Sequence, residues 1–199
     1  MNEMFRPVLT FTAAVSAMLG GCSPHRTAPE PPLAGASIGG PFTLTDQNGR
    51  TVSDRDFAGK YRIMYFGYTF CPDVCPTDMQ HLGAAMRLLD RRSPALAKRV
   101  VPIFVTVDPA RDTPGVLKQF VSAFSPRLVG LTGSPEAIAR VAKEYRVFYE
   151  KQPVQPGGGY MIQHSDQAIL FGPDGKPIVL VPVKDSPEAI VATLEQWVQ

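Results

Sequence analysis

The sequence predicts an α/β sandwich with a mixed central sheet and an N-terminal β-hairpin, and three observations support this class. Residues 42–53, FTLTDQNGRTVS, alternate apolar and polar side chains around Asn48-Gly49, which is a strong hairpin signal. Residues 61–69, YRIMYFGYT, and 99–108, RVVPIFVTVD, are apolar and β-favouring, as is typical of buried strands. Segments with helical periodicity alternate with these strands, and a second hairpin and a final helix close the chain.

The remaining elements follow from local signals. Four apolar residues recur at helical spacing after the first buried strand and predict one buried helix face: Met79, Leu82, Met86 and Leu89. The other predicted elements are, in order, a helix at 116–124, a short strand at 127–133, a helix at 134–149 that Ser134 and Pro135 open, a glycine-rich loop at 155–160, a hairpin of 165–171 and 177–183, and a capped helix at 186–199. This order resembles the thioredoxin-like fold, a three-layer sandwich.

Residues 1–21 are predicted to be a lipoprotein signal peptide. Arg6 gives a positive start, and residues 8–19 are apolar but shorter than a membrane-spanning helix requires. Leu19, two glycines and Cys22 resemble a bacterial lipobox, in which the cysteine is acylated and becomes the mature N terminus. The alternatives are an ordinary cleaved signal and a short uncleaved anchor. All three would export the chain.

The rest of the chain is predicted to be a linker and one domain. Residues 22–40 begin at the lipidated Cys22, are rich in proline, alanine and glycine, and predict a flexible linker. Residues 41–199 have an ordinary globular composition and a length that suits one domain. Because the net charge of +2 is small and the basic residues are scattered, we expect no nucleic-acid partner. We also expect a monomer.

Cys71 and Cys75 are the only thiols left for this domain if Cys22 carries lipid. An exported compartment permits a disulfide, but a bridge between residues four apart restricts the unfolded chain little, so a purely structural crosslink is a poor explanation. Either cysteine could cap the next helix. We expect Cys75 to be the N-cap, Pro76 the first helical residue, and Asp78 the residue that reaches back. Both sulfurs then lie near the positive end of the helix dipole, which favours thiolate.

The spacing of the pair favours a metal site over an ordinary redox motif. Three residues separate the cysteines in CPDVC, whereas thioredoxin-like oxidoreductases use two, and the charge of Asp73 opposes thiolate formation. Thiolate sulfur selects Cu(I), zinc or iron–sulfur chemistry. Two sulfurs are too few for a cluster or a closed structural zinc site, so at least one further ligand is required.

His164 is the candidate third ligand, because in this fold the loop before the late hairpin faces the helix start that carries the cysteines. Together with Cys71 and Cys75 it would make an S₂N set, which suits Cu(I), and imidazole also suits Cu(II). A lone histidine before a strand is otherwise a structural or solvent-facing residue. His81 is the weaker candidate and is expected to be exposed. Two methionines are expected to fill the core: Met64 and Met161.

Three motifs together make the domain resemble the Sco (SenC) family: YTFCPDVCP, VDPARDTP and QHSDQAILFGPDG. The match covers about residues 41–199. The resemblance implies a membrane-tethered copper chaperone that binds one copper through Cys71, Cys75 and His164. It further implies assistance to assembly of the binuclear CuA centre of cytochrome c oxidase subunit II, and a periplasmic copper donor or thiol reductant. The expected location is the inner membrane, with a lipid anchor and the domain facing the periplasm.

One residue departs from the family pattern. The family often has Asp immediately before the histidine, and here the residue is Gln163. We expect its neutral amide to orient the imidazole by hydrogen bonding, with less negative charge near the metal. Asp108, Arg111 and Asp112 predict a structural turn with an internal ion pair, or alternatively a docking surface or a support for the metal ligands.

The alternative function is a membrane-anchored thiol–disulfide oxidoreductase that reduces target cysteines. Cys71 and Cys75 would be its redox-active pair, and His164 would not be needed. A peroxiredoxin-like peroxidase is disfavoured, because it needs Thr or Ser and Arg around its thiol, and Thr69 alone is weak support. A non-catalytic scaffold would leave the paired thiols unexplained.

Overall fold

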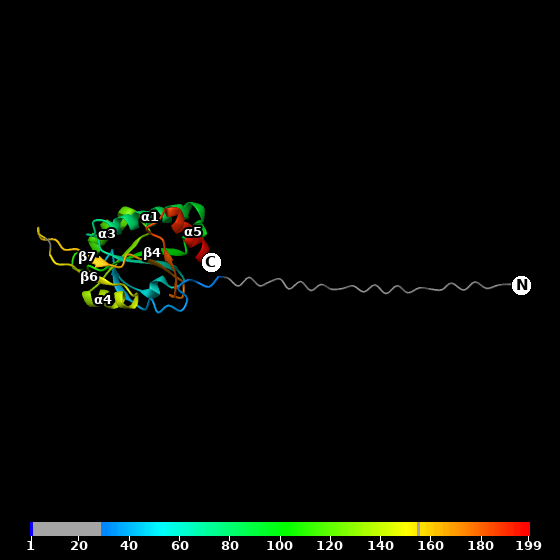
Figure 1. The fold of residues 1–199 in the computed structure, drawn as a ribbon, viewed down its shortest axis with the longest axis horizontal. Coiled ribbons are helices and arrows are strands. Elements are labelled where there is room, and N and C mark those ends of the chain that lie inside the picture. The colour runs from blue at the N-terminus through cyan, green and yellow to red at the C-terminus, as the bar shows by residue number, and fades with distance from the viewer. Residues whose placement is uncertain (2–28, 155) are drawn as a thin grey trace.

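The computed structural model describes Met1, residues 29–154 and residues 156–199. The predicted signal peptide after Met1, the predicted lipidation site Cys22 and the first part of the predicted linker lie outside the described residues. The first residues of the described domain and the β6–β7 loop lie at opposite ends of the domain (Figure 1).

Seven strands form the central sheet in the order β2-β1-β5-β4-β3-β8-β9. Strand β3 pairs in parallel with β4, and β4 in parallel with β5, while the β1–β2 and β8–β9 hairpins add antiparallel strands at the two edges. The predicted mixed sheet and N-terminal hairpin are therefore confirmed. The strand bounds are β1 Thr43–Asp46, β2 Thr51–Ser53, β3 Tyr61–Gly67, β4 Val100–Thr106, β5 Val129–Thr132, β8 Ala168–Phe171 and β9 Pro177–Val181.

Helices cover both faces of this sheet, which gives three layers. Helices α1, α3 and α5 lie on one face and α4 lies on the other (Figure 1). The helix bounds are α1 Val74–Arg92, α2 Pro94–Ala97, α3 Pro114–Phe124, α4 Pro135–Glu144 and α5 Pro187–Trp197, with a 3₁₀ turn η1 at Asp54–Phe57. The predicted caps are present: the Ser134 and Ser186 hydroxyls each accept a backbone N–H in the first turn of α4 and α5.

The apolar face of α1 is buried as the periodicity predicts. All four of its predicted core residues are fully buried: Met79, Leu82, Met86 and Leu89. Gly83 lies between them where α1 contacts the end of α3, because a Cβ there would stand 2.5 Å from the carbonyl oxygen of Phe124. The absence of a side chain at Gly83 therefore allows α1 and the end of α3 to pack closely.

The helix predicted for residues 134–149 is too long. It ends at Glu144, and Arg146 has a φ of 56°, so the chain leaves the helix there and the Val147 N–H donates to the carbonyl of Ala142. The next residues form β6, Tyr149–Lys151, which pairs antiparallel with β7, Ile162–His164, in a separate two-stranded sheet. The glycine-rich loop joins these two strands, so it is the tip of a hairpin that the sequence pattern did not reveal.

The last residues before the domain pack against it. The Leu33 N–H donates to the carbonyl of Ile178 at 3.0 Å, and the Gly39 N–H donates to the carbonyl of Glu144 at 2.9 Å. Ile38 packs on the hydrophobic core. The segment predicted as a linker therefore includes residues that contact the domain.

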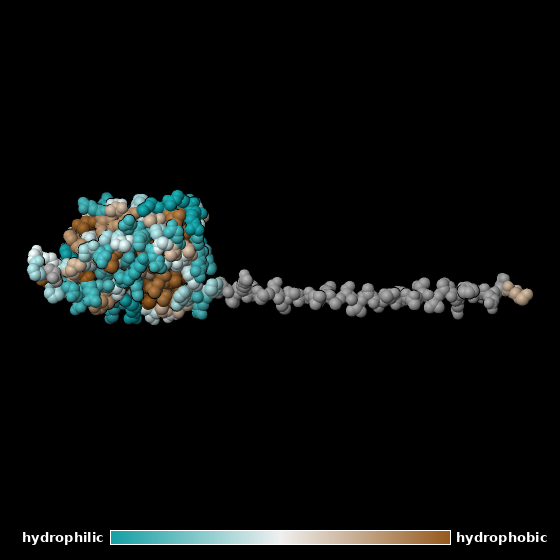
Figure 2. Space-filling view, turned by 45° about the horizontal axis from the view of Figure 1, so that its top comes forward, coloured by the Kyte–Doolittle hydropathy of each residue, from teal (hydrophilic) through white to brown (hydrophobic). Residues whose placement is uncertain are grey.

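The outer surface of the domain has a mixed character. On the face shown in Figure 2, hydrophilic residues surround several separate hydrophobic patches. No helix among the described residues is long and apolar enough to cross a bilayer.

Candidate metal centre

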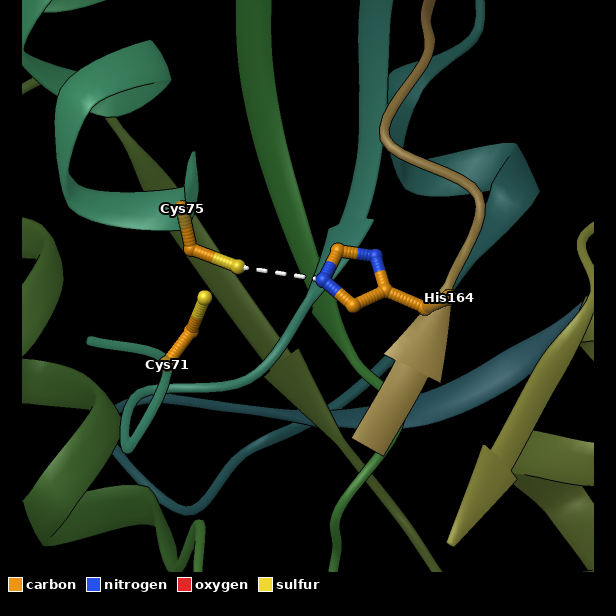
Figure 3. Close-up of side chains that lie close together, drawn as sticks. All are labelled: Cys71, Cys75 and His164. Carbon is orange, nitrogen blue, oxygen red and sulfur yellow. Dashed lines mark hydrogen bonds between the residues drawn. The ribbon is translucent and has the colours of Figure 1, made fainter. Parts of the chain in front are cut away.

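Three separate elements bring Cys71, Cys75 and His164 together. Cys71 lies in the loop after β3, Cys75 lies in the first turn of α1, and His164 ends β7. The two sulfurs and an imidazole nitrogen lie within 4.8 Å of one another. Figure 3 shows both thiols and the imidazole ring directed toward a common point. Among the described residues, this is the only group of three or more metal-ligating side chains so arranged.

The start of α1 differs from the expected one. The helix begins at Val74, with Asp73 in the cap position, so the expectation that Cys75 is the N-cap is wrong. Pro76 is the third helical residue, where a backbone N–H would have no partner inside the helix, so the proline removes no helical hydrogen bond. Cys75 thereby sits inside the first turn and is fully buried.

Asp78 does not reach back to the cap. Its buried carboxylate accepts a hydrogen bond from the Tyr65 hydroxyl at 2.8 Å. Burial raises the pKa of Asp78 and also that of Tyr65. The Tyr65 hydroxyl also interacts with the Cys75 thiol, so this polar pair supports the buried cysteine from the strand below it.

The two cysteines have opposite acidities. The hydrogen bond from the Cys75 thiol lowers the pKa of Cys71 to about 3, and the His164 ring and backbone N–H groups act in the same direction. The hydrogen bond to Cys71 and burial raise the pKa of Cys75. At neutral pH the site therefore holds one thiolate, Cys71, beside one thiol. Burial lowers the pKa of His164, but the interaction with Cys71 outweighs it and the net direction is upward.

The imidazole is oriented by the main chain. The Nδ1 atom of His164 is 2.9 Å from the carbonyl oxygen of Ser165, so Nδ1 carries the proton in the neutral ring and Nε2 is left as the acceptor. Nε2 is 3.4 Å from Cys75 Sγ. Gln163 is exposed and pairs with Glu150 across the β6–β7 hairpin. The expectation that Gln163 orients the ring is wrong, because successive strand residues point to opposite faces.

Comparison with known proteins identifies the family. The SCO1/SenC family model matches residues 30–199. The chain belongs to the SCO1/SenC family. SenC of Rhodobacter capsulatus is 46% identical over 141 residues, which cover 70% of this chain and 61% of that protein. The structure of Bradyrhizobium japonicum ScoI with copper bound is 41% identical, with a TM-score of 0.73, and the match covers 80% of this chain and 99% of that one.

More distant structures define the fold and the family's context. BsSco, described as a member of the Sco family of cytochrome c oxidase assembly proteins with a disulfide switch, is 26% identical with a TM-score of 0.62, over 80% of this chain and 92% of that one. The thioredoxin domain of a Bacteroides vulgatus thiol–disulfide oxidoreductase, at 18% identity and a TM-score of 0.57, shares the fold over 82% of this chain and 96% of that one. The predicted thioredoxin-like fold is confirmed. The chain spans about half the length of curated relatives that it matches, from 61% of Rhodobacter capsulatus SenC to 42% of an Arabidopsis thaliana SCO1 homologue.

The other candidate ligands of this SCO1/SenC chain lie outside the cluster. His81 is half-buried rather than exposed, and its Nδ1 is 3.0 Å from the carbonyl oxygen of Val183. Met64 is core filler as expected. Met161 is not, because it is 38% exposed and its sulfur accepts a hydrogen bond from the Tyr68 hydroxyl at 3.8 Å. Tyr68 in turn meets the His164 ring edge-on, with ring centroids 5.7 Å apart.

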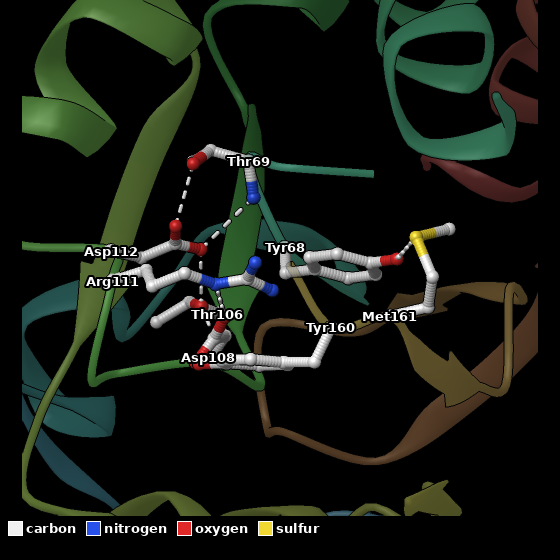
Figure 4. Close-up of polar contacts among 8 residues, drawn as sticks. All are labelled: Tyr68, Thr69, Thr106, Asp108, Arg111, Asp112, Tyr160 and Met161. Carbon is white, nitrogen blue, oxygen red and sulfur yellow. Dashed lines mark hydrogen bonds and ion pairs between the residues drawn. The ribbon is translucent and has the colours of Figure 1, made fainter. Parts of the chain in front are cut away.

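The predicted ion pair after β4 is present and extends into an aromatic cluster (Figure 4). Arg111 pairs with Asp108, and the Tyr160 hydroxyl donates to the same carboxylate at 2.8 Å. The Arg111 guanidinium stacks 3.7 Å from the centre of the Tyr160 ring and 4.8 Å from that of Phe70. Sequence reasoning missed Tyr160, whose only signal was its place beside the glycine-rich loop. The cluster ties that loop to the residue before Cys71.

Asp112 ties the loop after β3, which leads to Cys71, to strand β4. Its fully buried carboxylate accepts hydrogen bonds from the Thr69 N–H at 3.0 Å, the Thr69 hydroxyl at 2.6 Å and the Thr106 hydroxyl at 2.5 Å. Burial raises its pKa. The Thr69 hydroxyl is therefore committed to a carboxylate rather than to a thiol. The turn at residues 108–112 therefore contains the predicted ion pair and also supports the loop that leads to Cys71.

Proposed function

We propose that this chain is a copper chaperone that binds one copper through Cys71, Cys75 and His164. The observation that carries the proposal is the convergence of two sulfurs and one imidazole nitrogen within 4.8 Å, from three elements of the fold. Two soft thiolates and one imidazole suit Cu(I), and three ligands are too few for a closed structural zinc site. Relatives solved with copper bound support the choice of metal.

The protonation states favour metal capture. Cys71 is already a thiolate at neutral pH, so only Cys75 has to release a proton when a metal binds. Ser165 holds the His164 ring with Nε2 toward the sulfurs, which reduces the ordering required on binding. Bound copper supplies no reaction step in this role, because it is the cargo.

The recipient that fits is cytochrome c oxidase subunit II, with assembly of its CuA centre as the outcome. The support is family membership and the description of BsSco as one of the cytochrome c oxidase assembly proteins. Phe70 is 53% exposed and precedes Cys71, and the exposed Met161 contacts Tyr68, whose ring meets that of His164. These apolar side chains provide contacts for a recipient at the edge of the site.

Copper titration tests the ligand set. We suggest the full chain in nonionic detergent, with Cys22→Ser so that the thiols are those of Cys71 and Cys75. The reduced protein is expected to bind one copper, and His164→Ala to weaken binding by at least about 100-fold, since even the loss of an outer partner of a ligand costs about 10–100-fold. His81→Ala is the matched control and is expected to bind normally. Unchanged binding by His164→Ala would refute the three-ligand site.

A second function, thiol–disulfide reduction, is favoured by the low pKa of Cys71. The Cys71 thiolate would attack a target disulfide, forming a mixed disulfide and releasing one target thiolate. Cys75 would then lose its proton and attack the Cys71 sulfur, closing the Cys71–Cys75 disulfide and releasing the second target thiol. The two electrons pass to the target, and a periplasmic thiol reductant restores the pair. Turnover of a disulfide substrate without metal, at an unchanged rate in His164→Ala, would favour this function over copper delivery.

We further propose that the chain is exported and held at the inner membrane, facing the periplasm, by acylated Cys22. The lipobox-like sequence supports this attachment. Mass spectrometry of the membrane fraction is expected to find acyl chains on an N-terminal Cys22, and Cys22→Ser to release the processed domain or leave it unprocessed. An unmodified Cys22 in the wild type would overturn the anchor.

A further inference from the structure

Arg62 is a buried arginine at the opposite end of β3 from the loop that carries Cys71. It is 6% exposed, and its Nε is buried with no hydrogen-bond partner in the part of the chain that the structure describes. No carboxylate of a described residue forms an ion pair with it. The Phe171 ring lies 6.0 Å away, at the outer limit of a cation–π contact. A buried charge without a partner is costly. Binding of an anion would supply the counter-charge that this guanidinium lacks among the described residues.

The guanidinium opens onto a pocket rather than into a closed core. The pocket has a volume of about 320 Å³, and its lining includes Gly40, Arg55, Arg62, Pro173 and Gly175. A Cβ on Gly175 would stand 2.8 Å from Nη2 of Arg62, and this glycine has a φ of +81°. The glycine therefore leaves room for a small group to approach the guanidinium.

Two carboxylates, those of Asp54 and Asp174, also line the pocket, and neither forms an ion pair with Arg55 or Arg62. Asp54 accepts a hydrogen bond from the Phe42 N–H at 3.2 Å. Asp174 forms an ion pair with Lys176 at 3.3 Å and accepts the Lys176 N–H at 3.1 Å. Arg55 is exposed and has no ion pair with any described carboxylate. Two guanidinium groups thus face one pocket without a carboxylate bound to either.

We propose that this pocket binds a phosphate group. Arginine presents a planar fork of N–H donors that matches phosphate oxygens, and a second arginine at the rim adds charge. The pocket also lies where the chain enters the domain, since Gly40 lines it, at the opposite end of β3 from the Cys–Cys–His cluster. The phosphate is either a free anion or the headgroup of a membrane lipid. The site does not rest on the copper function.

Thermal unfolding of the full chain in nonionic detergent tests the site, with inorganic phosphate as the probe and chloride at equal ionic strength as the reference. A ligand that binds only the folded state raises the unfolding midpoint with its concentration. We expect a saturable rise for the wild type, a smaller rise for Arg62→Lys, and none for Arg62→Met. Arg91→Met removes an exposed arginine of α1 that has no ion pair with a described residue, and it is expected to respond as the wild type does.

Copper binding by Arg62→Met serves as the check on folding, because Arg62 lies far from the metal ligands. A second arm uses glycerol 3-phosphate, the headgroup of phosphatidic acid without its acyl chains. A larger Arg62-dependent rise with this probe than with phosphate would assign the site to a lipid monoester, and the reverse would assign it to the free anion. An equal rise in the wild type and Arg62→Met with both probes, or no rise in either protein, would overturn the proposal.

Discussion

Replacing Asp112 with alanine is expected to lower the free energy of unfolding by about 3 kcal/mol. The carboxylate is fully buried and accepts three hydrogen bonds, two from Thr69 and one from Thr106. Each buried donor left without a partner costs about 1–3 kcal/mol, so three donors would give about 3–9 kcal/mol. The lower end applies, because the hydroxyls can rotate and because the substitution removes a carboxylate whose burial is itself unfavourable, as its raised pKa indicates.

Urea unfolding at pH 7 measures this loss, with Asp112→Asn as the matched control. The asparagine oxygen can accept the Thr69 N–H and the Thr106 hydroxyl, and its amide can donate to the Thr69 hydroxyl, so about 1 kcal/mol is expected. Because burial raises the Asp112 pKa in the folded state, ionisation of this carboxyl weakens the wild type, so the loss measured for Asp112→Ala is expected to grow as pH falls through the folded pKa. A loss below about 1 kcal/mol in Asp112→Ala, or an equal loss in both variants, would refute the reasoning.

Three further predictions rest on single positions. Gly83→Ala is expected to cost about 1–3 kcal/mol of unfolding free energy, because its Cβ would stand 2.5 Å from the Phe124 carbonyl oxygen. Gly115→Ala, with nothing within 4 Å of its Cβ, is the control and is expected to stabilise the protein by about 0.4–1 kcal/mol. Equal free energies of unfolding in urea for the two variants would contradict the packing argument. The rate of Cys71 alkylation by iodoacetamide, followed by peptide mass mapping, should stay nearly constant from pH 8 to pH 5, since the pKa of Cys71 is about 3. A tenfold fall in this rate per pH unit would instead show an ordinary thiol. Ser186→Ala removes the N-cap of α5 and is expected to cost about 1 kcal/mol, and no change in the unfolding midpoint would argue against that cap.

The order of elements could be predicted because it follows from local patterns. The Asn48-Gly49 turn, the apolar strand β3 and the 3.6-residue spacing along α1 each act through neighbouring residues, and each appears in the structure. The hairpin of β6 and β7 could not be predicted in the same way. Its strands have three residues each, too few for a periodic signal. The helix before them ends where Arg146 adopts a positive φ, and arginine, unlike glycine, does not predict such a backbone conformation.

The surroundings of the site were predicted less well than its members. Cys71, Cys75 and His164 were singled out from residue type and spacing, but the partner of the imidazole is the Ser165 carbonyl rather than Gln163. Main-chain partners are available at every residue, so the sequence carries no mark of which one is used. The same holds for Asp78, whose role depends on Tyr65 from a strand behind it.

The sequence by itself determined the α/β order, the paired cysteines with their three-residue gap, and the histidine proposed as the third ligand. Only the tertiary structure decided that His164 meets a cysteine 89 residues away, that Cys71 rather than Cys75 is the thiolate, and that Arg62 is buried beside an open pocket. The physical reason is the separation along the chain of the groups that determine each property. Secondary structure depends on side chains a few residues apart, whereas acidity, burial and ligand convergence depend on groups that become neighbours only when the sheet assembles.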